Sequence, residues 1–294
     1  MKLCFRPKKF STEVRAILTQ ANAIIAEYEA QDLRMTLRQL YYQFVSRDVI
    51  PNTEKSYKRL GSIISDGRLA GEIDWDAIED RARQPQTPAH WSNVREALDG
   101  RLRAFRLDRW ENQAKRVELW VEKDALAGVL WPIASRWHIT LMVNRGYSSS
   151  SAMYESAVRL HDPVKQKQPK VVLYLGDHDP SGEDMVRDVR DRLIMFGVQS
   201  LEVTKVALTM AQVRQYDPPP NPAKLTDSRA TKYVEEHGDE SWEVDALPPD
   251  VLTRIVEAAI QEHVDVRRIR AIQREEDAQR ERVNEFLEGL DLDE

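Results

Sequence analysis

Three carboxylates with suggestive spacing follow two β-prone runs of this sequence. Glu122 ends the run VELWV, and Asp177 and Asp179 alternate just beyond the run KVVLYL. Alternate side chains of an extended segment project to one side, so the two aspartates can share a cation. Mg²⁺ prefers a few carboxylate oxygens and keeps positions open for phosphate, so the pattern predicts a magnesium site. The alternatives are paired surface aspartates and, for Glu122, an ion pair with Lys123 or Arg145.

A tyrosine pair in the segment TLRQLYYQFV is the second group that can do chemistry. Tyr41 belongs to a stripe of apolar residues at helical spacing, which predicts that it faces the core. Tyr42 is turned about 100° from Tyr41, toward the polar side, with Arg38 four residues before it on the same face. A guanidinium beside a phenol favours the phenolate and stabilises charge on a phosphate, so Tyr42 is a candidate nucleophile. The alternative is a boundary residue that packs its ring and leaves its hydroxyl in water.

Helical periodicity dominates the amino-terminal part of the chain. Residues 11–30 begin with Ser11 as a candidate cap and repeat apolar residues at helical spacing. A second helix is predicted over 36–47 and a third over 53–69. Three helices of this length suggest a winged-helix-like DNA-binding module, which we place within residues 1–110.

The periodicity changes after residue 110. Short apolar runs alternate with segments of helical pattern; the runs are VELWV, ITLMV, KVVLYLG and LEVTKVAL, and the helical segments start near Asp124, Ser149, Gly182 and Thr209. This alternation predicts an α/β domain over 111–216, with a parallel sheet covered by helices on both faces. Sites in such sheets form at the carboxyl ends of the strands, where both acidic motifs lie.

The segment YDPPPNP at 216–222 cannot continue a helix and indicates a boundary. The region 217–294 is predicted to be a linker followed by two helices, of which the last is highly charged. We expect this helical carboxyl-terminal region to lie against a domain surface or to serve dimerisation.

The bulk composition narrows the class of protein. The chain has 294 residues, a hydrophobic content of 41% and a net charge of −6, which suits two ordinary globular domains. It contains no apolar run of eighteen residues, and Cys4 is its only cysteine, so we expect a cytoplasmic protein without an internal disulfide. Residues 1–70 hold 12 Lys or Arg against 7 Asp or Glu, so the amino-terminal part is the expected nucleic-acid surface, with a solvated charged face as the alternative.

The three segments VEKDA, NRGYSSSSA and GDHDPSGEDM together resemble the successive motifs of a Toprim domain. They are most similar to those of the topoisomerase VI A subunit and its meiotic relative, which makes double-strand breaks. The resemblance implies that Glu122, Asp177 and Asp179 hold Mg²⁺. It implies only proximity to the site for the loop Arg145, Gly146 and Tyr147.

The segment RQLYY resembles the same family's winged-helix module, in which an arginine precedes an aromatic-tyrosine pair. The resemblance implies that Tyr42 is the transesterifying tyrosine, that Arg38 steadies the phosphate, and that Glu122 is catalytic as well as a metal ligand. The expected protein is a compact, phage- or mobile-element-type homologue that cuts double-stranded DNA as a type IIB topoisomerase A subunit does.

The family also sets expectations about partners. Two subunits cooperate, the tyrosine of one acting with the metal site of the other, so a homodimer is implied. The sequence contains no nucleotide-binding loop, so any ATPase would be a separate subunit. Two alternatives stay open: a hydrolytic Toprim nuclease in which the metal activates water, and a non-catalytic DNA-binding subunit that needs a partner.

Overall fold

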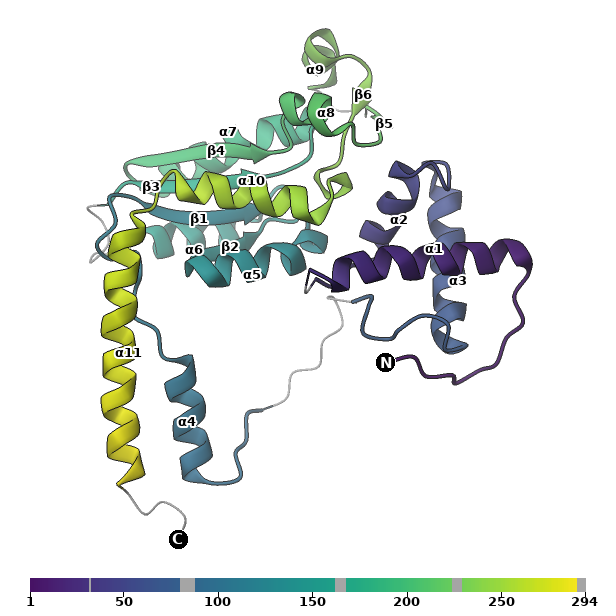
Figure 1. The fold of residues 1–294 in the computed structure, drawn as a ribbon. Helices are drawn as coiled ribbons and strands as arrows, with labels where there is room; N and C mark the ends of the chain where they lie inside the picture. Colours follow the sequence, from purple (N-terminus) through teal and green to yellow (C-terminus); the bar gives the residue numbers. More distant parts are fainter. Residues whose placement is uncertain (32, 80–87, 162–167, 224–228, 290–294) are drawn as a thin grey trace.

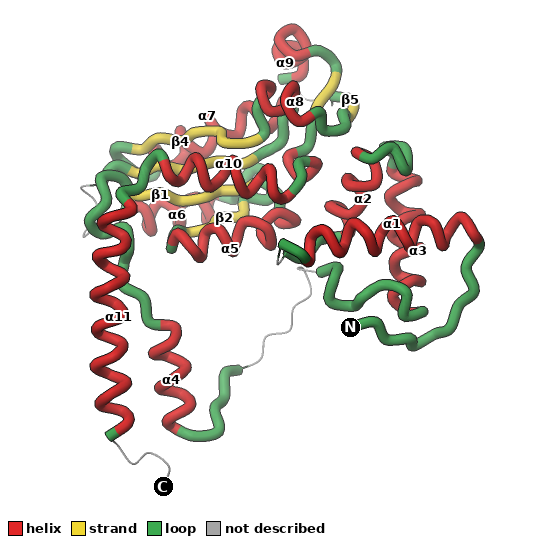
Figure 2. Tube along the Cα trace, viewed as in Figure 1, coloured by secondary structure: helices red, strands yellow, loops and turns green. Residues whose placement is uncertain are grey.

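The structure of this chain is a computed structural model that describes residues 1–31, 33–79, 88–161, 168–223 and 229–289 (Figure 1). It contains a three-helix amino-terminal unit, an α/β unit built on one parallel sheet, and a pair of helices that extends away from the sheet (Figure 2). The α/β class predicted from the sequence is confirmed.

The amino-terminal unit is formed by three capped helices, α1 (Thr12–Glu29), α2 (Leu37–Ser46) and α3 (Glu54–Leu69). Thr36 and Gln39 form the reciprocal capping box that their spacing predicts, which fixes where α2 begins. Each helix contributes apolar side chains to one shared core. In the described residues before 80, β pairing is limited to isolated bridges, one joining Cys4 with Ala70 and one joining Met35 with Ile78. A β-hairpin wing is therefore not part of what the structure describes there.

The α/β unit has a four-stranded sheet in which all neighbouring strands are parallel, in the order β2-β1-β3-β4. The strands coincide with the four predicted runs: β1 (Arg116–Val121), β2 (Thr140–Val143), β3 (Lys170–Leu175) and β4 (Leu201–Ala207). All six residues of β3 are buried, because helices cover both faces of the sheet. The predicted parallel sheet is confirmed.

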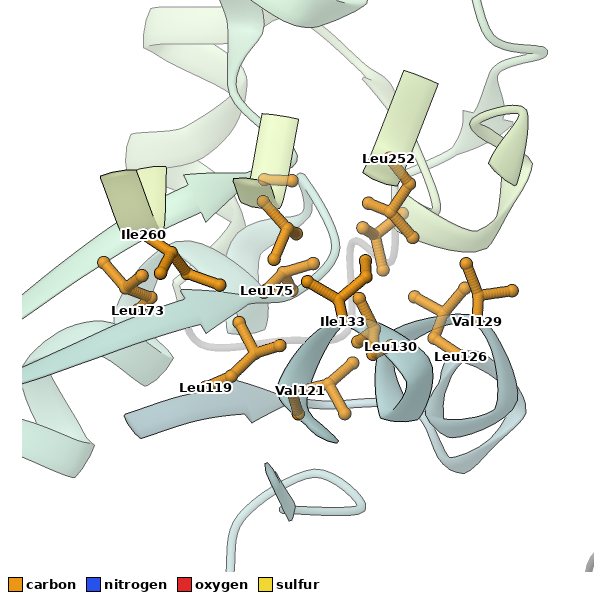
Figure 3. Close-up of a cluster of buried hydrophobic side chains, with 14 of the residues drawn as sticks. Leu119, Val121, Leu126, Val129, Leu130, Ile133, Leu173, Leu175, Leu252 and Ile260 are labelled. Atoms are coloured by element: carbon orange, nitrogen blue, oxygen red, sulfur yellow. The ribbon is translucent and has the colours of Figure 1, made fainter. Parts of the chain in front are cut away.

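Alternate residues of the central strands enter two separate cores. Leu119, Leu173 and their odd-numbered neighbours pack against α5 (Ala127–Trp137) and α10 (Pro249–Gln261) (Figure 3). The even-numbered residues pack against α6 (Ser150–Leu160) and α7 (Pro180–Met195) on the other face. The prediction that helices cover both faces of the sheet is confirmed. One of the covering helices, α10, comes from the region that was expected to follow the sheet domain.

Short elements connect β4 to α10 at the carboxyl-terminal edge of the sheet. They are α8 (Met210–Tyr216), β5 (Asn221–Pro222), α9 (Ala230–His237), β6 (Glu240–Ser241) and the 3-10 turn η2 (Val244–Ala246). A similar turn, η1 (Asp124–Leu126), links β1 to α5.

A pair of helices, α4 (Val94–Ala104) and α11 (Val266–Glu288), extends beyond the sheet (Figure 1). Arg95 of α4 donates to the carbonyl of Leu287, and Arg280 of α11 donates to the carbonyl of Leu102, so the two helices lie side by side. The longest described helix, α11, is rich in charged residues. None of the described helices is long and apolar enough to cross a membrane.

The turn η2 joins the amino-terminal unit to the α/β unit. Ala246 is buried in the core of the three amino-terminal helices, whereas Val244 and Leu247 are buried in the core between the sheet, α5 and α10. One short segment therefore belongs to both cores, and it fixes α2 beside the edge of the sheet.

Candidate active site

Glu122 and Asp177 meet because they follow adjacent parallel strands, β1 and β3. The amide of Glu122 donates to the carbonyl of Leu175 at 2.8 Å, which continues the pairing one residue past β1. The amide of Asp177 then donates to Oε2 of Glu122 at 3.2 Å. The structure thus brings these two predicted site residues into direct contact.

Two glycines allow this close approach. A Cβ atom at Gly176 would lie 2.9 Å from Oε2 of Glu122, and one at Gly182 would lie 2.2 Å from the carbonyl oxygen of Asp177. Real Cβ contacts essentially never reach these distances. At Gly182 the obstacle is backbone, so glycine is required there to keep the strand end and the start of α7 together, whereas at Gly176 the side chains of Tyr174 and Glu122 would have to move.

We expect Gly182→Ala to disturb the site as well as the fold, because the added methyl group meets backbone rather than a movable side chain. Overpacking of this kind lowers the free energy of unfolding by about 1–3 kcal/mol. Denaturant unfolding measures this loss. Gly100→Ala in α4 is the control, because a Cβ atom at this position would make only ordinary van der Waals contacts. Replacing glycine by alanine inside a helix also stabilises the helix by about 1 kcal/mol. Equal stability of the two variants would contradict the tight packing at Gly182.

Asp179 begins α7 as its N-cap. Its Oδ1 accepts from the amide of Gly182 at 2.6 Å and from the hydroxyl of Ser181 at 2.9 Å, the contacts that start the helix. Across the described residues, no three His, Cys, Asp or Glu side chains converge closely enough to hold a metal ion. Asp179 thus lies at the edge of the sheet where Glu122 and Asp177 meet, but its carboxylate is engaged in the cap.

Burial and mutual repulsion disfavour the charged forms of the two adjacent carboxylates. Burial raises the pKa of Asp177 to about 7, with Lys123 lowering it and the charges of Glu122 and Asp245 raising it further. Burial also raises the pKa of Glu122, and the nearby charge of Asp179 adds to this increase. Buried, crowded oxygen donors of this kind fit a hard divalent cation, which would offset the repulsion.

Lys123 connects the carboxylates to a second acidic pair. Its Nζ lies 2.9 Å from Oδ1 of Asp177, 2.7 Å from Oε2 of Glu243 and 2.7 Å from Oδ1 of Asp245. These carboxylates raise the pKa of the lysine although burial opposes them, so it stays charged. Arg145 pairs with Asp124. In the described structure, Lys123 and Arg145 therefore form their ion pairs with carboxylates other than that of Glu122.

Arg38 binds the same acidic pair from α2. Its Nε donates to Oδ2 of Asp245 at 3.1 Å, and its Nη2 forms a short ion pair with Glu243 and donates to the hydroxyl of Tyr42 at 3.3 Å. The guanidinium also lies 5.6 Å from the centre of the Tyr42 ring. Asp177, Lys123, the acidic pair, Arg38 and Tyr42 therefore form one continuous cluster of polar contacts.

Tyr42 shares a helix face with Arg38, as its spacing predicts, but this face is covered. The exposed fraction of Tyr42 is 4%, as low as that of its neighbour Tyr41, because the segment around η2 covers this face of α2. Burial and the carboxylates of Asp245 and Glu243 raise the pKa of Tyr42, and Arg38 lowers it only in part. The phenol is therefore held in its neutral form.

An open cavity of about 310 Å³ leads to this tyrosine. Its lining includes Arg38, Tyr42 and Glu243, together with the rings of Tyr41 and Tyr57. The cluster is thus reachable from solvent on the side of α2 and α3.

The loop NRGY adjoins the strand ends. The amide of Arg145 donates to the carbonyl of Glu122 at 2.8 Å, and the backbone then turns through left-handed conformations at Arg145 and Gly146. The hydroxyl of Tyr147 donates to Oδ2 of Asp184 in α7 at 3.0 Å, which directs this side chain toward α7.

Sequence reasoning missed Lys123, Glu243 and Asp245 as members of the cluster. Lys123 belongs to the VEKDA motif, and a cationic residue inside this acidic motif was a signal that could have identified it as a member of the site. The acidic pair stands beyond the predicted domain boundary, and its only local signal is the spacing of two carboxylates around one apolar residue.

Comparison with known proteins found neither a protein family that matches this sequence nor a characterised protein that is detectably similar to it.

Proposed function

We propose that this chain binds double-stranded DNA and cleaves it by transesterification, with Tyr42 as the nucleophile and Mg²⁺ held by Glu122, Asp177 and Asp179. The observation that carries the proposal is the continuous cluster that links the Tyr42 hydroxyl to Asp177 through Arg38, the acidic pair and Lys123. A phenol, two cations and crowded carboxylates at one strand edge are the groups that phosphoryl transfer requires.

The folded units fit this activity in outline. The α/β unit would serve as the Toprim domain, and the three amino-terminal helices would serve as the winged-helix-like module that presents Tyr42 to DNA. The motif resemblance in VEKDA, NRGYSSSSA and GDHDPSGEDM is the reason for preferring this assignment over other α/β metal sites.

In the proposed reaction the Tyr42 oxygen attacks the phosphorus of a phosphodiester, and a sugar oxygen leaves as a hydroxyl. The phenolic proton passes to water as the new bond forms, and the leaving sugar oxygen takes a proton from water. The Arg38 guanidinium therefore has to stabilise negative charge on the tyrosine oxygen and on the phosphate. Bound Mg²⁺ would supply Lewis-acid stabilisation of the phosphate charge.

The proposed assembly is a homodimer, because cutting both strands of a duplex requires two tyrosines. In the family that the motifs resemble, the tyrosine of one subunit acts with the metal site of the other. In this chain α2 lies beside the strand ends of its own sheet, and five contacts of the cluster join Arg38 or Lys123 to carboxylates of the same chain. A separate ATPase subunit would be needed for strand passage.

The second candidate is hydrolysis, with a metal-bound water as the nucleophile and Tyr42 as a packing residue. The burial of Tyr42 and its raised pKa favour this alternative, because both hold the phenol neutral. The two reactions leave different products.

The test is incubation with supercoiled DNA and Mg²⁺, followed by denaturation in detergent with and without protease. Transesterification yields DNA ends linked to protein that enter a gel normally only after proteolysis, and EDTA prevents them. Free ends without proteolysis would identify hydrolysis. Intact DNA in every reaction would favour a non-catalytic DNA-binding subunit.

A further inference from the structure

Two cations converge on the carboxylate of Glu243. Its Oε2 lies 2.7 Å from Nζ of Lys123 and forms a short ion pair with Nη2 of Arg38, which also donates to the hydroxyl of Tyr42. A non-bridging oxygen of a phosphodiester also carries about one negative charge and accepts from the same donors. The donors that surround Glu243 therefore form an anion site.

The two acidic residues of the cluster differ in how replaceable they are. The side chain of Asp245 has an exposed fraction of 0%, whereas that of Glu243 is 24% exposed and lines the cavity beside Tyr42. Asp245 is therefore a fixed partner of the two cations, and Glu243 is the carboxylate that an incoming anion can displace.

The backbone on each side of Glu243 is held firmly. Trp242 exchanges two backbone hydrogen bonds with His178, at 2.8 and 2.9 Å, and the amide of Val244 donates to Oδ1 of Asp177 at 2.9 Å. Since Val244 is also buried in the sheet core, a change of the Glu243 side-chain rotamer is enough to empty the anion site. No movement of a whole unit is needed.

We propose that Arg38 and Lys123 form a binding site for one DNA phosphate beside Tyr42, and that the carboxylate of Glu243 occupies it until a phosphodiester displaces it. This inference rests on the proposed function for the identity of the ligand, but not for the existence of the anion site. It assigns Lys123 a role in binding phosphate, next to Asp177 and so next to the proposed cation.

Phosphate binding without cleavage tests this site. In EDTA, we expect Glu243→Gln to bind a short blunt-ended DNA duplex about tenfold more tightly than the unsubstituted protein, because the competing internal anion is gone and about 1.4 kcal/mol corresponds to that factor. Fluorescence anisotropy at fixed ionic strength measures the affinity. We also expect inorganic phosphate to raise the melting temperature of Glu243→Gln more than that of the unsubstituted protein.

The controls separate a local effect from a general change in charge. Glu240→Gln removes the same charge from an exposed position of the same segment, so it should change the affinity little. In the Glu243→Gln background, Lys123→Ala should remove the gain, because the two residues share one contact. Should Glu243→Gln fail to fold, Glu243→Asp withdraws the carboxylate by one methylene and should give a smaller gain.

Three outcomes are distinguishable. If Glu243→Gln and Glu240→Gln bind DNA with equal affinity and respond equally to phosphate, the anion site does not exist, while the proposed cleavage can still stand. If the protein does not bind DNA but phosphate still stabilises Glu243→Gln selectively, the site stands and the proposed function fails. Weaker binding of both ligands by Glu243→Gln would overturn the inference, since Glu243 would then assist binding.

Discussion

We expect Tyr42→Phe to abolish protein-linked DNA ends and to leave the fold intact. Removing the nucleophile of a covalent enzyme lowers its rate by up to about a millionfold, so cleavage should fall to background. The substitution removes only the hydroxyl, whose contact with Arg38 spans 3.3 Å. The cost in unfolding free energy should be about 0.5–1.5 kcal/mol, the usual contribution of one hydrogen bond. Denaturing gels and denaturant unfolding measure the two effects.

Tyr41→Phe is the matched control for this experiment. Tyr41 precedes Tyr42 in α2 and is equally buried, but its hydroxyl donates to Oδ1 of Asn52 at 2.9 Å, away from the cluster. We expect this variant to lose comparable stability and to keep cleaving DNA. Undiminished formation of linked ends by Tyr42→Phe would remove the tyrosine from the mechanism, and free ends from both variants would identify hydrolysis.

We expect Asp177→Asn to abolish both cleavage and the stabilisation by Mg²⁺. At ten times its dissociation constant, a ligand that binds only the folded state stabilises it by about 1.4 kcal/mol. That corresponds to a rise in melting temperature of about 2–4 °C for a domain of roughly this size. Thermal unfolding with and without Mg²⁺ measures the difference. Asp191→Asn, on the exposed surface of α7, is the control and should respond as the unsubstituted protein does.

The sign of the pH dependence follows from the pKa of Asp177, which burial raises from its ordinary 3.8 to about 7. The stabilising contribution of a carboxyl with a raised folded pKa is complete below pH 3.8 and is lost as the pH rises to about 7. Relative to Asp177→Asn, the metal-free protein should therefore lose up to about 1.4 kcal/mol per pH unit across this window.

Magnesium should act in the opposite direction, because it binds the deprotonated carboxylate. The rise in melting temperature caused by Mg²⁺ should be larger at pH 8 than at pH 6, and Asp177→Asn should remove the difference. A Mg²⁺ response of the same size in that variant would place the cation elsewhere.

The elements were predictable because their signals are local. The cap at Thr36, the apolar run before Gly176 and the alternation of strand and helix all operate over a few residues, and the structure has the corresponding helices and strands. The contact between Glu122 and Asp177 was also predictable from the sequence, because adjacent parallel strands end at one edge of a sheet.

The surroundings of Tyr42 were not predictable in the same way. Periodicity identifies the apolar face of α2, but it carries no information about what covers the other face. The covering segment contributes Asp245, which contacts Arg38 across 207 residues of sequence. The same long-range packing brings α10 onto the sheet, where Leu252 joins the core with residues of α5 (Figure 3).

The placement of Ala246 in the core of the amino-terminal helices bears on how the protein is made. During synthesis α2 leaves the ribosome long before η2, so Tyr42 and Arg38 exist in the cell for a time without the segment that covers them. The core around α2 and the cluster beside it are completed by the same late residues. A growing or truncated chain that lacks them has the proposed nucleophile, Tyr42, but neither the buried acidic pair nor a fixed position for Tyr42 beside the carboxylates. The order of synthesis thus delays the arrangement proposed for cleavage until both units are present.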